Sequence, residues 1–394
     1  MGCESAPANG LESTIRDEKI IVSGGLSIMK AIGIGGAGNK VAAKLDDDAT
    51  LVNVSQTEMD KIEGSGRRIN APVHSTTGQF KGSRKNPEIG MDAYNAIRRE
   101  LSELIRGSMV ISSTGGGTGN GITTGILKEI TDVDDIDIQD KTFFCLILPY
   151  DKLESAEYVS NSINFMQGPL AEAIDKGNTG NIVLFSNQKK FKEKIAEDEY
   201  NGMMVESLKI FLDIPDKNDR LKLLDGHIDH EDFTAFIAKP YFNHFNYFEY
   251  NPAEAFEKQL DANNNELLLP PEDAIEAMFL VEVPKGGDPT IFYDILTYFK
   301  SKKVSPIYSV VENPDIKKPF VTVSRLYSRK PAELVDEFNQ INEENVQAKV
   351  DKSIEQHVEL KKMEVNLEKE AKAAGKKKGV GDDVLATLKR IGKL

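Results

Sequence analysis

Nine residues from Ser113 to Gly121 carry the clearest chemical pattern in this sequence, because five of them are glycine. The run reads Ser-Thr-Gly-Gly-Gly-Thr-Gly-Asn-Gly, after an apolar stretch at 109–112 and before a predicted helix at 122–130. A strand, a glycine turn and a helix start form a cradle for phosphate: glycine lets the backbone approach an anion, and the first N–H groups of the helix point at it. The Thr118 hydroxyl and the Asn120 amide can add further donors.

A second glycine-rich loop, Gly35-Gly36-Ala37-Gly38-Asn39, lies near the amino terminus. It follows an apolar stretch at 30–34 and precedes residues 40–45, which have helical character. A triphosphate needs donors from several sides, so we expect both loops to hold one nucleotide. The run at 113–121 lacks the Lys-Ser/Thr ending of a P-loop, so the pattern is not that common motif.

Hydrolysis of a phosphoanhydride also needs Mg²⁺ to spread charge, and carboxylates or amides to orient the attacking water. The densest acidic segment, 225–232, follows a predicted helix at 197–212. A helix of that length spans ~20–30 Å. The acids therefore cannot reach a nucleotide held by the same molecule, and we predict that they act on the nucleotide of the next subunit.

The same acidic segment also contains His227 and His230, three residues apart and beside Asp225, Asp229 and Asp232. This pattern can also occur in a metal site. A role in activating the attacking water explains two of these acids better than metal ligation does, so we predict no metal centre there. We find no Cys/His metal cluster and no Ser-His-Asp arrangement that spacing supports.

The elements that must position these residues alternate between strand and helix. Strands are predicted at 30–34, 51–55, 109–112, 143–148 and 181–185, and helices at 40–45, 91–106, 122–130, 153–176 and 197–212. This alternation favours an α/β fold with a doubly wound parallel sheet, which binds ligands at the carboxyl ends of its strands. We could not place the aromatic- and asparagine-rich stretch 238–270. Beyond it, strands at 277–283, 305–311 and 319–326 and a helix at 290–300 predict a smaller α/β domain.

Six segments are therefore expected. They are a leader at 1–28, a nucleotide-binding domain at 29–196, a central helix and connection at 197–224, a second domain at 225–330, a long helix at 331–374 and a tail at 375–394. We expect the leader to be poorly ordered. The tail is amphipathic and carries six Lys or Arg and two Asp, a net charge of +4. Such a segment typically docks onto a partner or a membrane surface.

Composition narrows the class of protein. The net charge is −14 over 394 residues, which argues against broad nucleic-acid binding by the body of the chain. No segment approaches ~20 consecutive apolar residues, so we expect no integral membrane association. The two cysteines form no disulfide framework: Cys145 lies in an apolar run and Cys3 in the polar leader. We therefore expect a reducing, cytoplasmic location.

The glycine loops resemble those of the tubulin/FtsZ GTPase superfamily. Gly115–Gly121 is similar to the loop Gly-Gly-Gly-Thr-Gly-(Thr/Ser)-Gly, with Asn120 as a departure, and 30–39 is similar to the first phosphate loop of the FtsZ/TubZ group. Residues 82–90 resemble Gly-x-Gly-Ala-Asn-Pro-Glu-x-Gly, which senses the terminal phosphate. The resemblance implies that the following residues contact GTP or GDP: Gly35, Gly36, Ala37, Gly38, Asn39, Asn86, Gly115, Gly116, Gly117, Thr118, Gly119, Asn120, Glu154, Asn187 and Asn201.

Within that set the resemblance implies different roles. Pro149-Tyr150 and Glu154 are similar to a segment that reaches the ribose, although the arginine that follows in the family is absent. Asn187 and Asn201 match asparagines that contact guanine.

The acidic segment is similar to the family loop Asn-x-Asp-x-x-Asp/Glu, which completes the active site of the neighbouring subunit. Asp229 and Asp232 match its acids, while His227 replaces its asparagine. The resemblance implies that Asp229 and Asp232 are catalytic and polarise the attacking water.

We therefore predict a GTPase that forms head-to-tail filaments, with GTP/GDP and Mg²⁺ as cofactors and itself as partner. The long helix and basic tail resemble TubZ-type proteins more than FtsZ, which favours segregation or positioning of plasmid or phage DNA through a DNA-binding adaptor on the tail. The alternatives are an FtsZ-like cell-division ring protein, a relative that binds nucleotide without hydrolysing it, and a dinucleotide-binding oxidoreductase.

Overall fold

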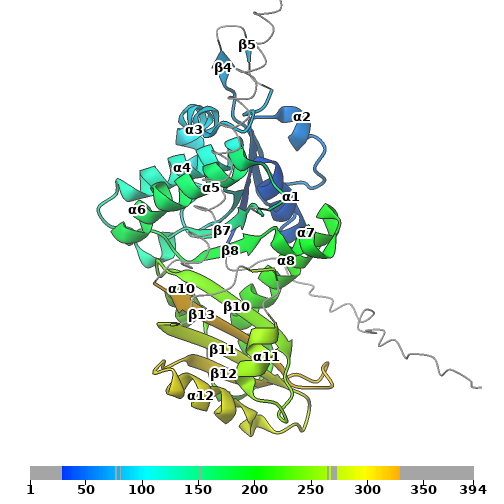
Figure 1. Ribbon diagram of the computed structural model, residues 1–394. Coiled ribbons are helices and arrows are strands. Elements are labelled where there is room, and N and C mark those ends of the chain that lie inside the picture. Colours follow the sequence, from blue (N-terminus) through cyan, green and yellow to red (C-terminus); the bar gives the residue numbers. More distant parts are fainter. Residues whose placement is uncertain are drawn as a thin grey trace, which may run out of the picture.

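The computed structural model describes residues 29–75, 78–79, 81–150, 152–263, 266–267 and 273–328 (Figure 1). The leader at 1–28, the predicted helix at 331–374 and the tail at 375–394 lie outside these ranges. Within the described chain, no helix combines the length and the apolar composition that crossing a bilayer requires.

The first domain is built on parallel strands in the order β3-β2-β1-β6-β7-β8. These strands are β1 (Ala31–Ile34), β2 (Thr50–Asn53), β3 (Arg68–Asn70), β6 (Met109–Ser113), β7 (Phe143–Leu148) and β8 (Ile182–Ser186). A short hairpin, β4 (His74–Ser75) and β5 (Gly78–Gln79), stands beside the sheet. The central strands are buried along their length, as a sheet covered on both faces requires.

Helices cover both faces of this parallel sheet, which confirms the predicted doubly wound arrangement. One face packs against α3 (Pro87–Leu101), α4 (Gly117–Thr131), α5 (Ala156–Gln167) and α6 (Pro169–Lys176). The other packs against α1 (Gly35–Leu45), α8 (Glu197–Leu212) and α10 (His230–Ile237). The short helices α2 (Gln56–Met59) and α7 (Gln188–Glu193) follow β2 and β8. Cys145 is buried in β7, as expected of a core residue.

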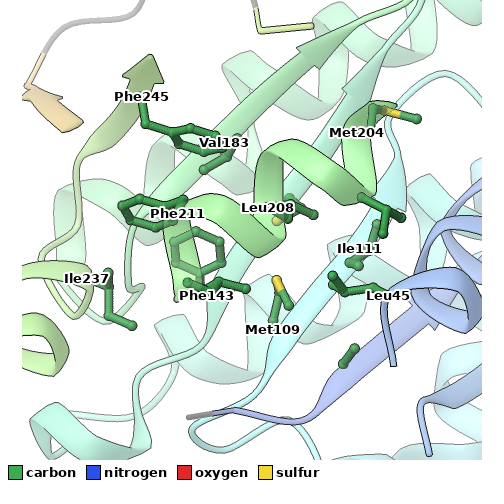
Figure 2. Close-up of a cluster of buried hydrophobic side chains, with 14 of the residues drawn as sticks. Leu45, Met109, Ile111, Phe143, Val183, Met204, Leu208, Phe211, Ile237 and Phe245 are labelled. Carbon is green, nitrogen blue, oxygen red and sulfur yellow. The ribbon is translucent and has the colours of Figure 1, made fainter. Parts of the chain in front are cut away.

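Helix α8 connects the two domains and has the bounds that the sequence predicted. Its buried side chains recur at helical spacing, with Met204, Leu208 and Phe211 lying against the sheet (Figure 2). The Phe211 ring stacks on Phe245 of the second domain, with ring centroids 4.7 Å apart and planes 7° apart. Its centroid is also 6.4 Å from that of Phe143 in β7. One aromatic side chain therefore contacts both domains.

The second domain continues the sheet in the order β10-β13-β11-β12-β9, with mixed strand directions. The strands are β9 (Lys222–Gly226), β10 (Phe242–Glu249), β11 (Glu276–Val283), β12 (Ile307–Glu312) and β13 (Phe320–Tyr327). The other elements are α9 (Ile214–Arg220), α11 (Phe256–Ala262), α12 (Phe292–Ser301) and the 3-10 helix η2 (Pro289–Ile291), whereas the 3-10 helix η1 (Ile138–Asp140) lies in the first domain between α4 and β7. Aromatic residues such as Phe279 and Phe299, with centroids 6.1 Å apart, fill its own core.

Strands β8 and β10 join the two halves of the sheet through the pair Ile182–Phe242. Strand β8 also forms an isolated bridge between Phe185 and Leu267, where the Ser186 nitrogen donates to the Glu266 carbonyl oxygen at 3.1 Å. The buried Asn181 side chain supplements these pairings, donating to the carbonyl oxygens of Phe236 at 3.2 Å and Lys239 at 2.8 Å. Its Oδ1 accepts a hydrogen bond from Asn243 at 2.8 Å. The strands of the two domains thus form one eleven-stranded sheet, separate from the hairpin β4-β5.

Several predicted boundaries were wrong. The helix expected at 122–130 begins at Gly117, inside the glycine run. The helix expected at 153–176 is two helices, because Gly168 and Pro169 interrupt it. The unplaced stretch 238–270 contains β10 and α11. Strand β9 and helix α9 lie where only a polar connection was expected.

Candidate functional site: a nucleotide pocket and a distant acidic helix start

A cavity of about 480 Å³ opens where the two glycine loops meet, at the carboxyl ends of the parallel strands. That volume lies within the usual range for small-molecule sites. The predicted residues that line it are Gly35, Gly36, Ala37, Gly115, Gly116, Gly117, Thr118, Gly119, Glu154, Asn187 and Asn201. The fold therefore brings together residues that are more than 160 positions apart in the sequence.

Two helices begin at this cavity, and neither start is capped by a side chain. Helix α1 begins at Gly35 and α4 at Gly117, and their N-cap residues, Ile34 and Gly116, make no side-chain cap hydrogen bond. The first N–H groups of a helix have no partner within it and carry a partial positive charge. Two such uncapped starts lining one cavity form a binding site for an anion such as a polyphosphate.

The glycines allow the two loops to touch. Gly35 has a φ of +72°, and a Cβ added there would lie 3.0 Å from the backbone nitrogen of Gly119. A Cβ on Gly117 would lie 2.5 Å from the Ser83 hydroxyl and 2.6 Å from the Asn86 nitrogen. Any larger residue at 35 or 117 would separate these segments, so glycine is required by the close approach of backbone to backbone.

One amide fixes the loop at 82–86 to the glycine run. Asn161 of α5 donates hydrogen bonds to the carbonyl oxygens of Lys85 and Gly115, each at 2.9 Å. A single side chain therefore sets the distance between the segment that resembles a terminal-phosphate sensor and the start of the cradle.

The opposite end of the cavity is lined by polar groups that could hold a nucleoside. The Glu154 carboxylate accepts from the Tyr150 backbone nitrogen at 2.6 Å and from the Asn187 side chain at 3.0 Å. It thereby orients Asn187 beside Tyr200 and Asn201, both on the first turns of α8. Burial raises the pKa of the Tyr200 phenol, with nearby Glu266 and Glu193 adding to the rise, so this hydroxyl stays protonated.

Four predicted contacts do not line the cavity. A Cβ on Gly38 would lie 2.1 Å from the Ile111 carbonyl oxygen, and the Asn39 amide hydrogen-bonds the Val52 backbone in both directions at 3.2 Å. Gly38 and Asn39 thus join α1 to the sheet.

The other two are asparagines with structural partners. Asn86 accepts from the Glu88 nitrogen at 2.9 Å as the N-cap of α3, and Asn120 donates to the carbonyl oxygens of Thr114 at 2.6 Å and Asn161 at 3.0 Å. Both line a separate groove, together with Gly121 and Thr124 of α4.

The cavity also contains charged residues that sequence reasoning missed. Arg84 and Lys85 line its phosphate end, Lys190 its nucleoside end, and Glu58 lies beside Gly36. The sequence did indicate Glu58, because it follows the polar residues Asn53 and Ser55 at the carboxyl end of a predicted strand. Arg84 and Lys85 lie in the segment 82–90, whose resemblance indicated the terminal phosphate without singling out these side chains, and no signal pointed to Lys190.

The predicted catalytic acids lie away from this cavity, at the start of α10. Asp229 is the N-cap residue of that helix and accepts from the Asp232 nitrogen at 2.7 Å. The end of α10 packs at the amino end of β8, where the Asn181 nitrogen donates to Ile237 at 2.6 Å. The cavity lies at the carboxyl ends of the same strands, so the acids and the glycine loops lie at opposite ends of the strands.

The histidines of the acidic segment form no metal cluster. The His230 Nε2 lies 3.3 Å from Asp216 and 3.2 Å from Asp219 of α9. His227 is exposed. Among the residues that the structure describes, no three His, Cys, Asp or Glu side chains converge as metal ligands would.

Comparison with solved structures identifies this architecture, although no protein-family model matches the chain. TubZ from Bacillus thuringiensis serovar israelensis, solved as a GTPγS-form protofilament, aligns with a TM-score of 0.67 and 13% identity over 82% of this chain and 93% of that chain. CetZ from Methanosaeta thermophila aligns with a TM-score of 0.60 and 16% identity, over 86% and 97%. The fold is of the tubulin/FtsZ type. An FtsZ dimer from M. jannaschii extends this likeness, with a TM-score of 0.57 and 17% identity over 76% and 88%.

Proposed function

We propose that this protein is a filament-forming GTPase that binds GTP in the cavity between its glycine loops. Hydrolysis to GDP and phosphate takes place at head-to-tail contacts, where Asp229 and Asp232 of one subunit orient water on the nucleotide of the next. Each contact joins different surfaces of two copies, so repetition gives an open filament. The chain is its own principal partner, and its proposed location is the cytoplasm.

The observation that carries this proposal is the separation of the phosphate-binding cavity from the acidic residues Asp229 and Asp232. The cavity contains two uncapped helix starts, which suit phosphate, and Asp229 and Asp232 are not among its lining residues. Helix α8 has 16 residues, or about 24 Å at 1.5 Å per residue, with cavity residues on its first turns. The acids follow beyond its other end, so a complete site requires a second copy.

Guanine nucleotide is the ligand that the nucleoside end supports. Asn187 and Asn201 line this end, and the similar TubZ was solved with GTPγS. The same residues argue against a dinucleotide-binding oxidoreductase. A clear preference for GTP over NAD in equilibrium binding would support this assignment, and the reverse preference would exclude it.

Mg²⁺ fits beside the phosphates at Glu58. This carboxylate lies 3.4 Å from the position that a Cβ on Gly36 would take, and Asn53 donates to it at 3.1 Å. Mg²⁺ in nucleotide sites is usually held by one or two carboxylates, water and the phosphates themselves. The ion would supply charge neutralisation on the phosphate oxygens.

The sharpest test mixes two inactive variants. Gly116→Asp places a carboxylate in the cradle, where an added Cβ meets no atom within 4 Å, so phosphate is repelled without a clash. Asp229→Asn removes the charge of the acid and keeps an N-cap residue for α10. In an equal mixture, up to about one quarter of contacts pair an intact cradle with an intact acid. We expect each variant alone to be inactive and the mixture to release phosphate. No recovery from variants that still co-assemble would contradict catalysis between subunits.

A second test follows phosphate release and light scattering together as the wild-type concentration rises. A shared threshold for both signals is expected of hydrolysis at subunit contacts. Turnover proportional to concentration without scattering would indicate a self-contained enzyme. Scattering without turnover would favour the relative that binds nucleotide without hydrolysing it, and Asp229→Asn would then leave the filaments unchanged.

As the cellular role we propose segregation or positioning of plasmid or phage DNA, with a DNA-binding adaptor on the basic tail at 375–394. The likeness to TubZ supports this role, whereas the likeness to FtsZ keeps a division ring as the alternative. A fluorescent fusion distinguishes them: filaments that move with plasmid or phage DNA support segregation, and a midcell ring supports division.

A further inference from the structure

We propose that Lys85 is the residue by which this pocket distinguishes a nucleoside triphosphate from a diphosphate. The inference rests on the proposed function, since it assumes that a guanine nucleotide occupies the cavity. It concerns a residue that stands where the resembled loop has alanine, with Arg84 where that loop has glycine.

The position of Lys85 relative to the cradle is fixed. Asn161 holds its carbonyl oxygen and that of Gly115 at 2.9 Å each, and Ser83 and Asn86 press against Gly117. The lysine backbone therefore moves with the glycine run. The side chain thus starts from a fixed backbone position at the phosphate end of the cavity.

The backbone of this loop is unfavourable for the residues that it carries. Arg84 has a φ of 50° and Lys85 a φ of 61°, two successive non-glycine residues in the left-handed region. Glycine would adopt these angles without the steric penalty. Strained residues gathered at a cavity point to a function for the side chains, here for two cations beside an anion site.

The Lys85 ammonium is held loosely beside the cradle. It lies 4.7 Å from the centre of the Tyr158 ring and 3.8 Å from a Glu157 carboxylate oxygen. The lysine and glutamate side chains are 44% and 65% exposed, so water screens their attraction. Tyr158 packs on Gly115, because a Cβ there would lie 3.0 Å from the tyrosine Cβ. The ammonium can therefore exchange a weak carboxylate contact for a phosphate without leaving the site.

Lys190, the third cation of the lining, is placed differently. It belongs to α7, directly after the segment that holds Asn187, and its ammonium lies over the Phe191 ring at 4.7 Å. Lys190 is thus at the nucleoside end, where GTP and GDP are alike. Lys85 lies at the end where an additional phosphate brings additional negative charge.

The test measures binding of GTPγS and of GDP, each with Mg²⁺, to the full chain below the concentration at which scattering begins. Lys85→Gln is expected to weaken GTPγS binding about tenfold, the effect of losing one charge-assisted hydrogen bond, and to leave GDP binding within about twofold. Lys85→Arg should retain the preference for GTPγS. Lys190→Gln, an identical charge change in the same cavity, should weaken both nucleotides alike.

An equal loss of both nucleotides in Lys85→Gln, or no loss of either, would overturn the inference while leaving GTP binding intact. Failure of the wild type to bind either nucleotide would instead refute the proposed function, and the inference with it. Thermal unfolding of each variant checks that its fold is retained.

Discussion

The segments at the two ends of α8 differ in how their polar groups are hydrogen-bonded. At its start, the phosphate end of the cavity is lined by two helix starts that lack a side-chain cap and by glycines, which have no side chain to cover the backbone N–H groups. At its end, the acidic segment is bonded within itself and to α9: Asp229 caps its own helix, and His230 lies between Asp216 and Asp219 of α9. A site that binds a ligand keeps donors unused, whereas a rigid, internally bonded segment suits presentation to a neighbouring molecule.

The largest effect is expected from a substitution in α8 that weakens the contact between the two domains. Phe211→Ala removes the ring that contacts Phe245 and Phe143, and should destabilise the fold by about 3–5 kcal/mol. Urea denaturation measures this loss. Tyr293→Ala is the matched control, because Tyr293 is 57% exposed, and its loss should be far smaller. Similar losses of stability in both variants would contradict the role of Phe211 in joining the two domains.

At the acidic end, comparison of two substitutions separates catalysis from capping. Asp229→Ala and Asp229→Asn should both lower GTP turnover on the order of 100-fold, as expected when a group that positions or deprotonates water is lost. Only Asp229→Ala should also lose the helix cap, at about 1 kcal/mol of stability. Steady-state phosphate release and denaturation provide the two readings. Weakened GTPγS binding by the monomer in Asp229→Asn would place the acid at its own pocket instead.

Two asparagines make the same kind of bridge, one beside the cavity and one away from it. Asn161 joins Lys85 to Gly115, and Asn178 joins Ile130 to Val133 with hydrogen bonds of 2.9 and 2.7 Å. Alanine at either position should cost about 1 kcal/mol of stability. Only Asn161→Ala should also weaken GTPγS binding, by about fivefold, because only its bridge adjoins the cradle. Equal binding losses would mean that the effect is general destabilisation.

The smallest effect is expected at the exposed ion pair between Lys40 of α1 and Glu197 of α8. Their charged atoms are 2.9 Å apart, but the side chains are 47% and 55% exposed. Lys40→Gln should therefore change stability by less than about 1 kcal/mol. A larger loss in urea denaturation would show that this surface contact, rather than the buried aromatic stack, fixes α8 to the first domain.

Local sequence patterns were sufficient for the elements whose hydrophobic period is regular. Helix α8 has the predicted bounds, and the glycine runs lie at the cavity as expected. The errors arise where partners are distant. The aromatic side chains of β10 pack against α8 and α11, so their spacing carries no clear local period.

Among the site residues, the asparagines show the same limit. Asn39 and Asn120 belong to the glycine loops in sequence, yet the Asn39 amide is occupied by the Val52 backbone and the Asn120 amide by Asn161, which only the fold brings near. Asn86 is instead occupied locally, as the N-cap of α3. Conversely, Lys190 reaches the cavity from a segment in which no local pattern indicated a site. Side-chain direction and long-range contact decide these assignments, and neither can be inferred from spacing alone.

The short junction at β8 has a mechanical consequence. Shear between the two halves of the sheet acts on the Ile182–Phe242 pair, the Phe185–Leu267 bridge and the Asn181 amide network, whereas a fully paired ladder would share the same load along its whole length. The Phe211–Phe245 stack resists separation but, lacking directional bonds, tolerates a small rotation. Under tension along α8, compliance is therefore concentrated at this junction, while each domain deforms little.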